Sequence, residues 1–364
     1  MESLHKEEVK TTPFYKFHKA LNAKMAPFAG YEMPIQYIGI REEHEIVRSA
    51  SGIFDVSHMG EFIIEGIRAL DFLQYVTSND VAKLTIGKAQ YSCMPNADGG
   101  IVDDLLVYQL GLNKYMLVVN AANIIKDFDW LASQNSFGVD IIDVSDKTAL
   151  LAIQGPQTVH LLEKLVDNSI DLNTIRYYHF ITTTFAGIAN VIVSATGYTG
   201  SGGFELYFEA KDSDAIWNAV TNLGIQPIGL AARDTLRLEK GFSLYGNDID
   251  ATTTPISSGL GWITKFNKNF IAKEIIEKEY LGGSKQKLIA FKMLDKNIGR
   301  HGYEICDEKG AIIGRVTSGS ISPTLNIGIG LGYVASDYLK NNTVIFIKIR
   351  TKLVEAVITK LPFV

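Results

Sequence analysis

The sequence predicts an α+β protein that ends in a small all-β domain, and three observations lead to this class. From about residue 61 to 208, strand-like and helix-like segments mix without a regular βαβ repeat, which favours antiparallel sheets over a doubly wound sheet. From residue 287 the chain changes to short strands separated by turn residues, the pattern of a small barrel or sandwich. Hydrophobic residues make up 46% and charged residues 21% of the 364 residues, a composition typical of globular domains.

The elements of the mixed region follow from hydrophobic periodicity. Leu70, Leu73 and Val76 recur at helical spacing, and glycine-containing turns at 97–100 and 111–114 join three strands into a meander. An antiparallel sheet is therefore expected. The expected strands are 61–65, 91–95, 101–110, 115–120 and 148–153, with two more in 185–208, and the expected helices are 69–77, 122–133, 157–166 and 230–239.

A domain boundary is expected in residues 265–286, because this segment is rich in Lys and Glu and contains Gly282-Gly283. It is interpreted as a linker with a short exposed helix. The strands expected after it are 288–294, 303–306, 312–318, 328–334, 344–350 and 354–359. Closing these strands into a barrel would hide their edges.

Charge and cysteine content narrow the function classes. The net charge of -5, without long basic runs, argues against nucleic-acid binding. Cys93 and Cys306 lie far apart without further Cys or His clusters, which predicts neither a disulfide framework nor a structural zinc site. The N-terminal residues lack the apolar core of a secretory signal, and no apolar run is long enough to span a membrane. A cytoplasmic location is expected.

Two adjacent carboxylates, Asp103 and Asp104, follow a tight turn and begin an otherwise apolar strand. Side chains alternate across a strand, so the two carboxyl groups face opposite sides and only one can face any given pocket. A carboxylate among apolar residues needs partners, water or a ligand. The alternative is that both residues solvate the turn, where Asp is common.

Two further segments carry unusual residues. Residues 196–203 hold four glycines between two strands, either as a plain hairpin loop or as backbone that lets a ligand approach. The loop lacks the Lys and the following helix of a phosphate-binding loop. Arg233 and Arg237 share one face of a helix, where like charges require nearby acids or an anionic ligand.

Six motifs in order and spacing resemble the aminomethyltransferase family of the glycine cleavage system. They are residues 54–59 (FDVSHM), 99–104 (GGIVDD), 151–156 (LAIQGP), 196–200 (TGYTG), 230–234 (LAARD) and 245–248 (YGND). Residues 12–15, 28–30 and 314–319 extend the likeness over nearly the whole chain. The resemblance implies a cloverleaf of three domains around a central hole that holds tetrahydrofolate. The implied domains are residues 1–50 with 140–265, an inserted domain 51–139, a linker 266–286 and a barrel 287–364.

The family reaction moves the one-carbon unit of an aminomethylated lipoyl carrier protein to tetrahydrofolate and releases ammonia. The resemblance implies that Asp104 is the catalytic carboxylate and that Asp103 faces away and braces the turn. It implies that Glu205 accepts hydrogen bonds from the pterin and that Arg233 holds the ligand. Tetrahydrofolate is a co-substrate, the lipoylated carrier is the partner, and no metal or redox cofactor is implied.

Other candidate residues carry weaker expectations. Four aromatic residues could line the folate or could belong to the core, and Asn120 could be a polar neighbour of the site. The aromatic residues are Tyr91, Tyr108, Tyr198 and Trp262. His58 is interpreted as a satisfied structural histidine, because no Ser-Asp constellation accompanies it. Surface lysines of the N-terminal segment could meet an acidic carrier or could simply be solvated. These are Lys6, Lys10, Lys16, Lys19 and Lys24.

Two relatives of the same superfamily are the alternatives. A folate-dependent demethylase would use the same scaffold on a methylated sulfur or nitrogen donor. A non-enzymatic folate-binding assembly factor for iron–sulfur proteins carries Lys-Gly-Cys, whereas residues 240–247 here read KGFSLYGN without a cysteine. Some family members also continue past the Pro362-Phe363-Val364 motif with a ligand-contacting tail, and no such contact is carried over.

Overall fold

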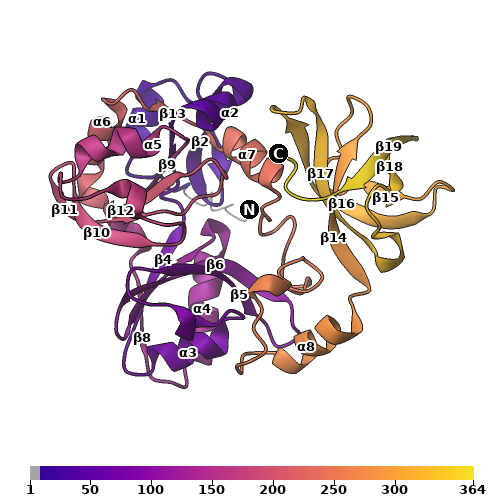
Figure 1. The fold of residues 1–364 in the computed structure, drawn as a ribbon, viewed down its shortest axis with the longest axis horizontal. Coiled ribbons are helices and arrows are strands. Elements are labelled where there is room, and N and C mark those ends of the chain that lie inside the picture. The colour runs from indigo at the N-terminus through magenta and orange to yellow at the C-terminus, as the bar shows by residue number, and fades with distance from the viewer. Residues whose placement is uncertain (1–8) are drawn as a thin grey trace, which may run out of the picture. The chain divides into compact units, whose positions relative to one another are not determined.

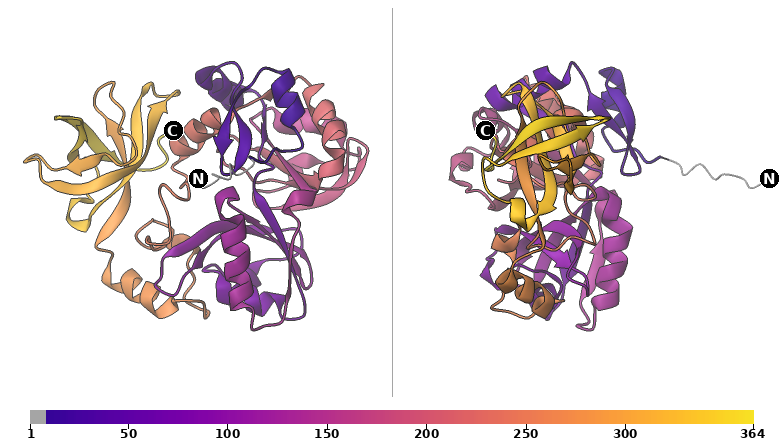
Figure 2. Two further views of the ribbon diagram at one scale, coloured as in Figure 1. Left: turned by 180° about the vertical axis from the view of Figure 1, so that it is seen from behind. Right: turned by 90° about the vertical axis from the view of Figure 1, so that its right-hand side faces the viewer.

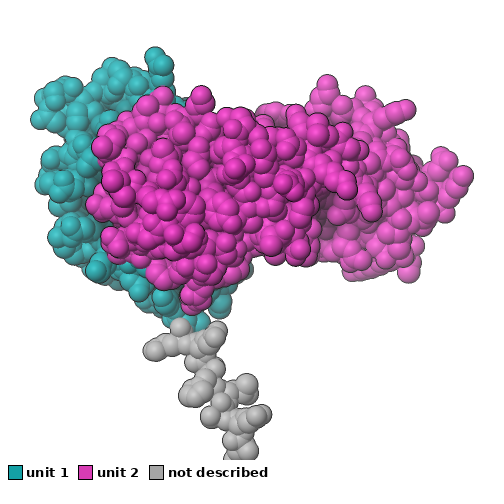
Figure 3. Space-filling model, turned by 90° about the horizontal axis from the view of Figure 1, so that it is seen from below, with its two compact units in different colours: residues 1–61, 143–197, 201–233 teal, residues 62–142, 198–200, 234–364 magenta. Residues whose placement is uncertain are grey.

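The chain divides into two compact units, coloured separately in Figure 3. The structure is a computed structural model that describes residues 9–364, so Lys6 lies outside the described residues. Unit 1 contains the chain up to residue 61 together with 143–197 and 201–233. Unit 2 contains 62–142, 198–200 and 234–364. The division into a discontinuous first domain, an inserted domain, a linker and a barrel stays a prediction.

A mixed six-stranded sheet forms unit 1, in the order β10-β11-β12-β9-β3-β13, antiparallel except for the β13–β3 pair. Its strands are β3 (Gly52–Asp55), β9 (Thr148–Gln154), β10 (Phe180–Phe185), β11 (Ile188–Ser194), β12 (Gly203–Glu209) and β13 (Gln226–Pro227). A separate hairpin pairs β1 (Lys24–Phe28) with β2 (Tyr31–Gln36). The helices are α1 (Tyr15–Ala20), α2 (Ile40–Ser49), α5 (Thr158–Leu162) and α6 (Ser213–Thr221). The unit's apolar core is formed by β9, β11 and β12 together with α5 and α6.

The predicted meander is confirmed in unit 2 as a five-stranded sheet of order β5-β6-β7-β4-β8. Its strands are β4 (Gly60–Glu65), β5 (Ala89–Pro95), β6 (Ile101–Gly111), β7 (Lys114–Val119) and β8 (Asp140–Asp143), with the helices α3 (Ala69–Val76) and α4 (Ile124–Gln134). Helix α7 (Leu230–Lys240) begins in unit 1 and ends in unit 2, where α8 (Lys273–Gly282) precedes the last strands. The apolar faces of α3 and α4 pack on the sheet and form the core.

The predicted C-terminal barrel is closed, in the order β14-β17-β16-β15-β18-β19 (orange to yellow in Figures 1 and 2). Its strands are β14 (Gln286–Met293), β15 (Glu304–Cys306), β16 (Ile312–Ser322), β17 (Ile327–Ala335), β18 (Val344–Ile349) and β19 (Lys352–Thr359). Closure pairs every strand on both sides, which leaves no free edge for aggregation. The mixed sheets and the barrel together confirm the predicted α+β class.

Several elements escaped the sequence patterns. Pro27 and Pro34 interrupt the β1–β2 hairpin, whose tight turn uses the positive φ angles of Ala29 (48°) and Gly30 (82°). The expected helix 157–166 is shorter than predicted, because after α5 the chain tightens into a 3-10 turn. The 3-10 helices are η1 (Val81–Lys83), η2 (Ala121–Asn123), η3 (Ser145–Lys147), η4 (Glu163–Leu165), η5 (Leu172–Thr174), η6 (Ala210–Asp212), η7 (Gly261–Ile263) and η8 (Ser336–Tyr338). In the described chain, no helix has the length and apolarity to span a bilayer.

Candidate active site

A tight turn between β5 and β6 delivers the two aspartates to the start of β6. Asn96 holds this turn, because its side-chain oxygen accepts hydrogen bonds from the backbone N–H groups of Asp98 (3.0 Å) and Gly100 (2.9 Å). Gly100 has no room for a side chain, since a Cβ atom would lie 1.9 Å from the carbonyl oxygen of Ala251. The prediction that Asp103 braces this turn is wrong, because the carboxyl group of Asp103 accepts its hydrogen bonds from Asn120 and Asn123, which lie outside the turn.

Strand alternation separates the two carboxyl groups, as predicted. Asp103 is fully buried on the face of β6 that carries Leu105 into the core of the five-stranded sheet. Asp104 is half-buried on the other face, opposite Cys93 of β5. When the β6–β7 register is continued by two residues, Asn120 stands opposite Asp104 on the other side. The alternative that both aspartates solvate the turn is therefore wrong.

Asn120 connects the two carboxylates. Its backbone N–H and side-chain amide donate to the two oxygens of Asp103 at 2.9 and 2.8 Å, and the amide nitrogen also donates to Asp104 Oδ1 at 2.9 Å. The hydroxyl of Tyr91 donates to Asp104 Oδ2 at 2.7 Å. The structure thus brings together three residues singled out from the sequence: Tyr91, Asp104 and Asn120.

The surroundings shift the proton affinity of Asp104. Burial raises its pKa to about 7 and the Asp103 carboxylate adds to this rise, while the hydrogen bonds from Tyr91 and Asn120 oppose it. Burial and the neighbouring Asp104 also raise the pKa of the Tyr91 hydroxyl well above its ordinary value, so this hydroxyl remains a donor. A carboxyl group that titrates near neutral pH is suited to take up and release a proton.

The other aromatic candidates differ in their surroundings. Trp262 is 60% exposed and its ring lies 6.2 Å from that of Tyr91. Tyr198 stacks on Phe242, donates its hydroxyl proton to the carbonyl of Ser243, and lies near enough to Tyr91 to raise its pKa. Tyr108, by contrast, is fully buried. Trp262 and Tyr198 therefore accompany the Asp104 site in unit 2, whereas Tyr108 lies in the interior.

Behind the aspartates lie polar residues that sequence analysis did not single out. Asn123 donates its amide to Asp103 Oδ1 at 2.7 Å. Lys126 donates to the carbonyl of Val102 (2.6 Å) and to the Tyr245 hydroxyl (2.9 Å). Asp127 is fully buried beside Asp103. Asn123, the N-cap residue of α4, and Asp127 lie four residues apart, on the side of the helix that buries Leu131. This spacing is visible in the sequence, but it does not reveal which groups the two residues contact.

Glu205 lies on β12 in unit 1, where Ser194 of β11 and Ala152 of β9 flank it. Its neighbours Phe204, Leu206 and Phe208 point into the apolar core, so Glu205 faces away from the core as predicted. Thr196 donates to Glu205 Oε2 at 2.5 Å and Tyr207 donates at 3.5 Å.

The surroundings of Glu205 act on its pKa in opposite directions. Burial raises the pKa of its carboxyl group, while the hydrogen bond from Thr196 and the charge of Arg233 lower it. The structure thus brings Glu205 and Arg233 within electrostatic range in unit 1. Two buried polar residues share this surrounding, His58 and Glu61.

His58 and Glu61 are buried without the partners expected of such groups. Within residues 9–364, His58 Nδ1 and both carboxyl oxygens of Glu61 have no hydrogen-bond partner. Burial lowers the pKa of His58 to about 4, so its ring is neutral at neutral pH, and burial raises the pKa of Glu61 well above its ordinary value. The neutral ring of His58 agrees with a structural role. The expectation that its hydrogen-bonding groups are all satisfied is wrong, because Nδ1 has no partner in the described chain.

Comparison with known proteins decides the family. The family model described as the GCVT N-terminal domain matches residues 14–268, and the glycine cleavage T-protein C-terminal barrel domain matches residues 286–364. The chain belongs to the glycine cleavage T-protein family. It is 55% identical to the aminomethyltransferase of Flavobacterium psychrophilum and 56% identical to that of Phocaeicola vulgatus, over 98% of this chain and 99% of each relative. The crystal structure of glycine cleavage system aminomethyltransferase T from Bartonella henselae is 33% identical, with a TM-score of 0.92 over 98% of both chains.

In this chain, residues in and beside the motifs at 230–234 and 245–248 hold the fold together. The guanidinium group of Arg237 is almost completely buried and donates to Asp234 Oδ1, Asp248 Oδ2 and Ser318 Oγ, each at 2.8 Å. Asp248 also accepts hydrogen bonds from Thr317 and Ser318 of the barrel. Asp234 and Asp248 supply the counter-charges expected beside Arg237. The hydrogen bonds that Ser318 accepts from Arg237 and donates to Asp248 connect α7 to β16 within unit 2.

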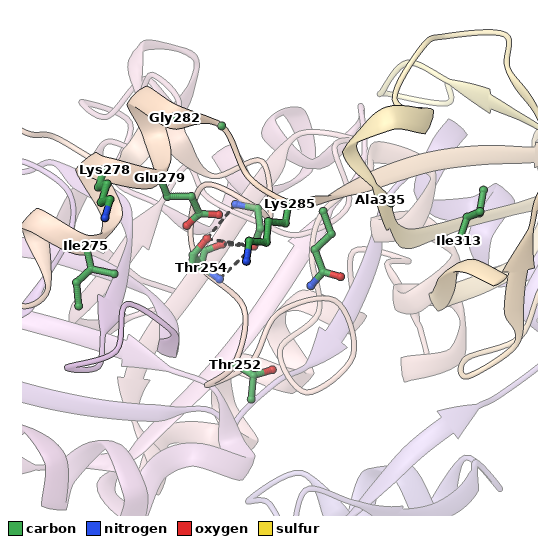
Figure 4. A pocket seen from close by; sticks show the side chains of 12 residues that line it. Thr252, Thr254, Ile275, Lys278, Glu279, Gly282, Lys285, Ile313 and Ala335 are labelled. Atoms are coloured by element: carbon green, nitrogen blue, oxygen red, sulfur yellow. Dashed lines mark hydrogen bonds between the residues drawn. The ribbon is translucent and has the colours of Figure 1, made fainter.

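The chain also has a cleft of about 800 Å³ in unit 2 whose lining includes neither aspartate (Figure 4). Its walls come from α8, the segment before it and the barrel strands β14, β16 and β17. They are lined by Thr252, Thr254, Ser257, Ile275, Lys278, Glu279, Gly282, Gly283, Lys285, Gln286, Ile313 and Ala335. None of the site residues predicted from the sequence is among these lining residues, so we assign the cleft no role in the chemistry.

Proposed function

We propose that this chain is a tetrahydrofolate-dependent aminomethyltransferase of glycine degradation. It would transfer the one-carbon unit of an aminomethylated dihydrolipoyl carrier to tetrahydrofolate, giving methylenetetrahydrofolate, ammonia and the dihydrolipoyl carrier. The observation that carries the proposal is 55–56% identity over nearly the whole chain to proteins named aminomethyltransferase. The Asp104 site described above supplies a group suited to this chemistry.

Asp104 is the proposed catalytic residue. When the carbon–sulfur bond of the donor breaks, positive charge develops on the aminomethyl carbon, and a fixed carboxylate nearby stabilises that charge. The same carboxylate is suited to accept the proton that the attacking nitrogen must lose, because its pKa is raised to about 7. As the carbon–sulfur bond breaks, the first folate nitrogen would bond to the carbon, and the proton it loses would end on the leaving thiolate. The second folate nitrogen would then displace the amino group from the same carbon, and its proton would leave with the amine as ammonia. Two carbon–nitrogen bonds replace one carbon–sulfur and one carbon–nitrogen bond, so the reaction balances.

The residues present fit a folate. When bound, tetrahydrofolate supplies the ring nitrogen that accepts the carbon. Glu205 is a buried carboxylate on the polar side of its strand, suited to accept hydrogen bonds from pterin amino and ring N–H groups. Arg233 offers a forked cation for a carboxylate or carbonyl group. We propose that Tyr91, Asn120, Tyr198 and Trp262 complete the folate-binding residues. Tyr108, predicted from the sequence as a further one, is fully buried, and we propose no ligand contact for it.

The proposal extends to the partner and the setting of the reaction. The partner is the lipoylated carrier protein of the glycine cleavage system, because the donor carbon is delivered on a lipoyl arm. We propose a cytoplasmic location for the reaction. We also propose a first domain of residues 1–50 with 140–265, an inserted domain of residues 51–139, a linker of residues 266–286 and a barrel of residues 287–364. The lysines of the N-terminal segment, including Lys10 and Lys16, form exposed ion pairs with Asp146 and Asp214.

A donor panel tests this function. Purified protein with tetrahydrofolate should form methylenetetrahydrofolate and ammonia in equal amounts from an aminomethylated lipoyl carrier. Methylated sulfur or nitrogen donors, offered in parallel, should give no turnover. Demethylation of one of those donors without activity on the carrier would replace the proposal by the related demethylase. A carrier bearing an unmodified lipoyl group is the matched control.

A further inference from the structure

A third carboxyl group lies beside the aspartate pair, and the mechanism above gives it no role. Asp127 of α4 is fully buried, and within residues 9–364 neither of its oxygens has a hydrogen-bond partner. Lys126 Nζ lies 4.0 Å from Asp127 Oδ1, too far for a hydrogen bond, and donates instead to Val102 and Tyr245. A buried ionised carboxylate without donors is strongly unfavourable, so Asp127 must satisfy its oxygens in another way.

Asp103 offers the missing partner. The Asp127 carboxyl group lies within hydrogen-bonding reach of the Asp103 carboxyl group, and two carboxyl groups form a hydrogen bond only when one carries a proton. Asp103 already accepts three N–H hydrogen bonds from Asn120 and Asn123, which favour its ionised form. Asp127 accepts none. The shared proton therefore belongs on Asp127, in agreement with the upward direction of its pKa.

We propose that Asp127 is a positioning residue: as a neutral acid it donates its O–H to Asp103 and, through Asp103 and Asn120, holds Asp104 in place and ionisable. The inference rests on the proposed function, because the geometry of Asp104 affects a rate only if aminomethyl transfer is the reaction. It adds to that function a residue which does not touch the substrate and acts through two others.

Charge balance explains why the proton matters. Among the described residues, Lys126 on its own helix and Tyr245 are the titratable groups that act on Asp127 besides the other two aspartates. Tyr91 and Cys93 on β5 act on Asp104. Burial raises the pKa of both tyrosines and of Cys93, which leaves them neutral, and Lys126 supplies one positive charge. If Asp127 were ionised, a third buried negative charge would oppose ionisation of Asp104. With Asp127 neutral, Asp103 and Lys126 carry opposite charges and Asp104 can titrate.

Infrared spectroscopy tests the proton on Asp127 without an enzyme assay. The difference spectrum between wild-type protein and Asp127→Asn, at about pH 8 and hence roughly four units above an ordinary aspartate pKa, should contain a carboxylic-acid C=O band. This band should shift in D₂O. Asp129→Asn, at an exposed position of the same helix, is the matched control and should not remove the band. A difference spectrum without the band would overturn the proposal.

Kinetics test the positioning role. Asp127→Leu removes the O–H donor and should lower kcat about tenfold or more, the ratio that corresponds to one hydrogen bond to a charged group, with KM for folate nearly unchanged. The acid limb of the pH–rate profile should move to higher pH, because Asp103 loses a donor and the aspartate pair binds its first proton more readily. Asp127→Asn still offers a donor and should recover most of the lost rate.

The outcomes separate this inference from the proposed function. Wild-type kinetics in Asp127→Leu, or a loss in Asp127→Asn as large as in Asp127→Leu with an unshifted pH profile, would contradict the positioning role. If Asp127→Leu fails to fold, as circular dichroism would reveal, the infrared spectra of the asparagine variant decide. Protein that shows the infrared band but no turnover of any aminomethyl carrier would refute the function and leave the protonation of Asp127 intact.

Discussion

Replacing Asp104 by asparagine should preserve the shape of the site and remove its charge. Asparagine keeps one side-chain oxygen as an acceptor for the hydrogen bond from Tyr91, which in the wild-type protein is 2.7 Å long. A carboxylate about 4 Å from a developing positive charge, at an effective dielectric constant of about 20 for a half-buried group, is worth about 4 kcal/mol. This energy corresponds to roughly a thousandfold in rate.

The expected result of Asp104→Asn is a fall of about a thousandfold in kcat, with a folate dissociation constant within about threefold of wild type. Single-turnover formation of methylenetetrahydrofolate measures the rate, and isothermal titration measures folate binding. Asp98→Asn, an exposed aspartate in the preceding turn, is the matched control. A fully active Asp104→Asn variant, together with an inactive but folded Asp103→Asn variant, would refute the assignment of Asp104.

Three further predictions concern pH and stability. The ionised form of Asp104 is the active one, so kcat should fall as pH drops through about 7. Tyr91→Phe removes a hydrogen bond that lowers the pKa of Asp104, so the acid limb of the pH–rate profile should move to higher pH. An unshifted acid limb would count against the Tyr91–Asp104 hydrogen bond. Arg237→Met leaves the buried Asp248 carboxylate without its counter-charge and should lower the free energy of unfolding, measured in urea, by about 3–5 kcal/mol. Adding Asp248→Asn should recover part of this loss. A loss below about 1 kcal/mol would contradict a stabilising role of the Arg237 hydrogen bonds. Burial raises the pKa of Glu61 above 4.5, so wild-type stability is lost as pH rises through the folded-state pKa of this group. Glu61→Gln should therefore be more stable than wild type in alkaline buffer and nearly as stable as wild type below pH 4.5. Parallel curves of stability against pH for the two proteins would refute this interpretation.

Local patterns predicted the elements of the meander and the barrel because each strand there alternates cleanly and each turn carries glycine or asparagine. The hairpin β1–β2 escaped because its prolines hide the alternation, and β13 escaped because two residues carry no period. Alternation alone also separated Asp103 from Asp104, which is the part of the site that a single strand determines. The family resemblance, and not the residue pattern, selected Asp104.

The rest of the site depends on register between strands and on packing of a helix, which local patterns do not contain. Asn120 faces Asp104 because β6 and β7 pair with Leu106 opposite Val118, and the same offset carried along the strands joins the two polar residues. The expected strands 101–110 and 115–120 with their four-residue turn already implied an offset close to this one, so Asn120 was within reach of sequence reasoning. Asp127 was not, since only the packing of α4 on the sheet brings its carboxyl group to Asp103. Asp127 is a buried acid to which no group among the described residues donates a hydrogen bond, and only its three-dimensional surroundings explain it. The proton that we propose on Asp127 explains how Asp103 and Asp104 can be charged.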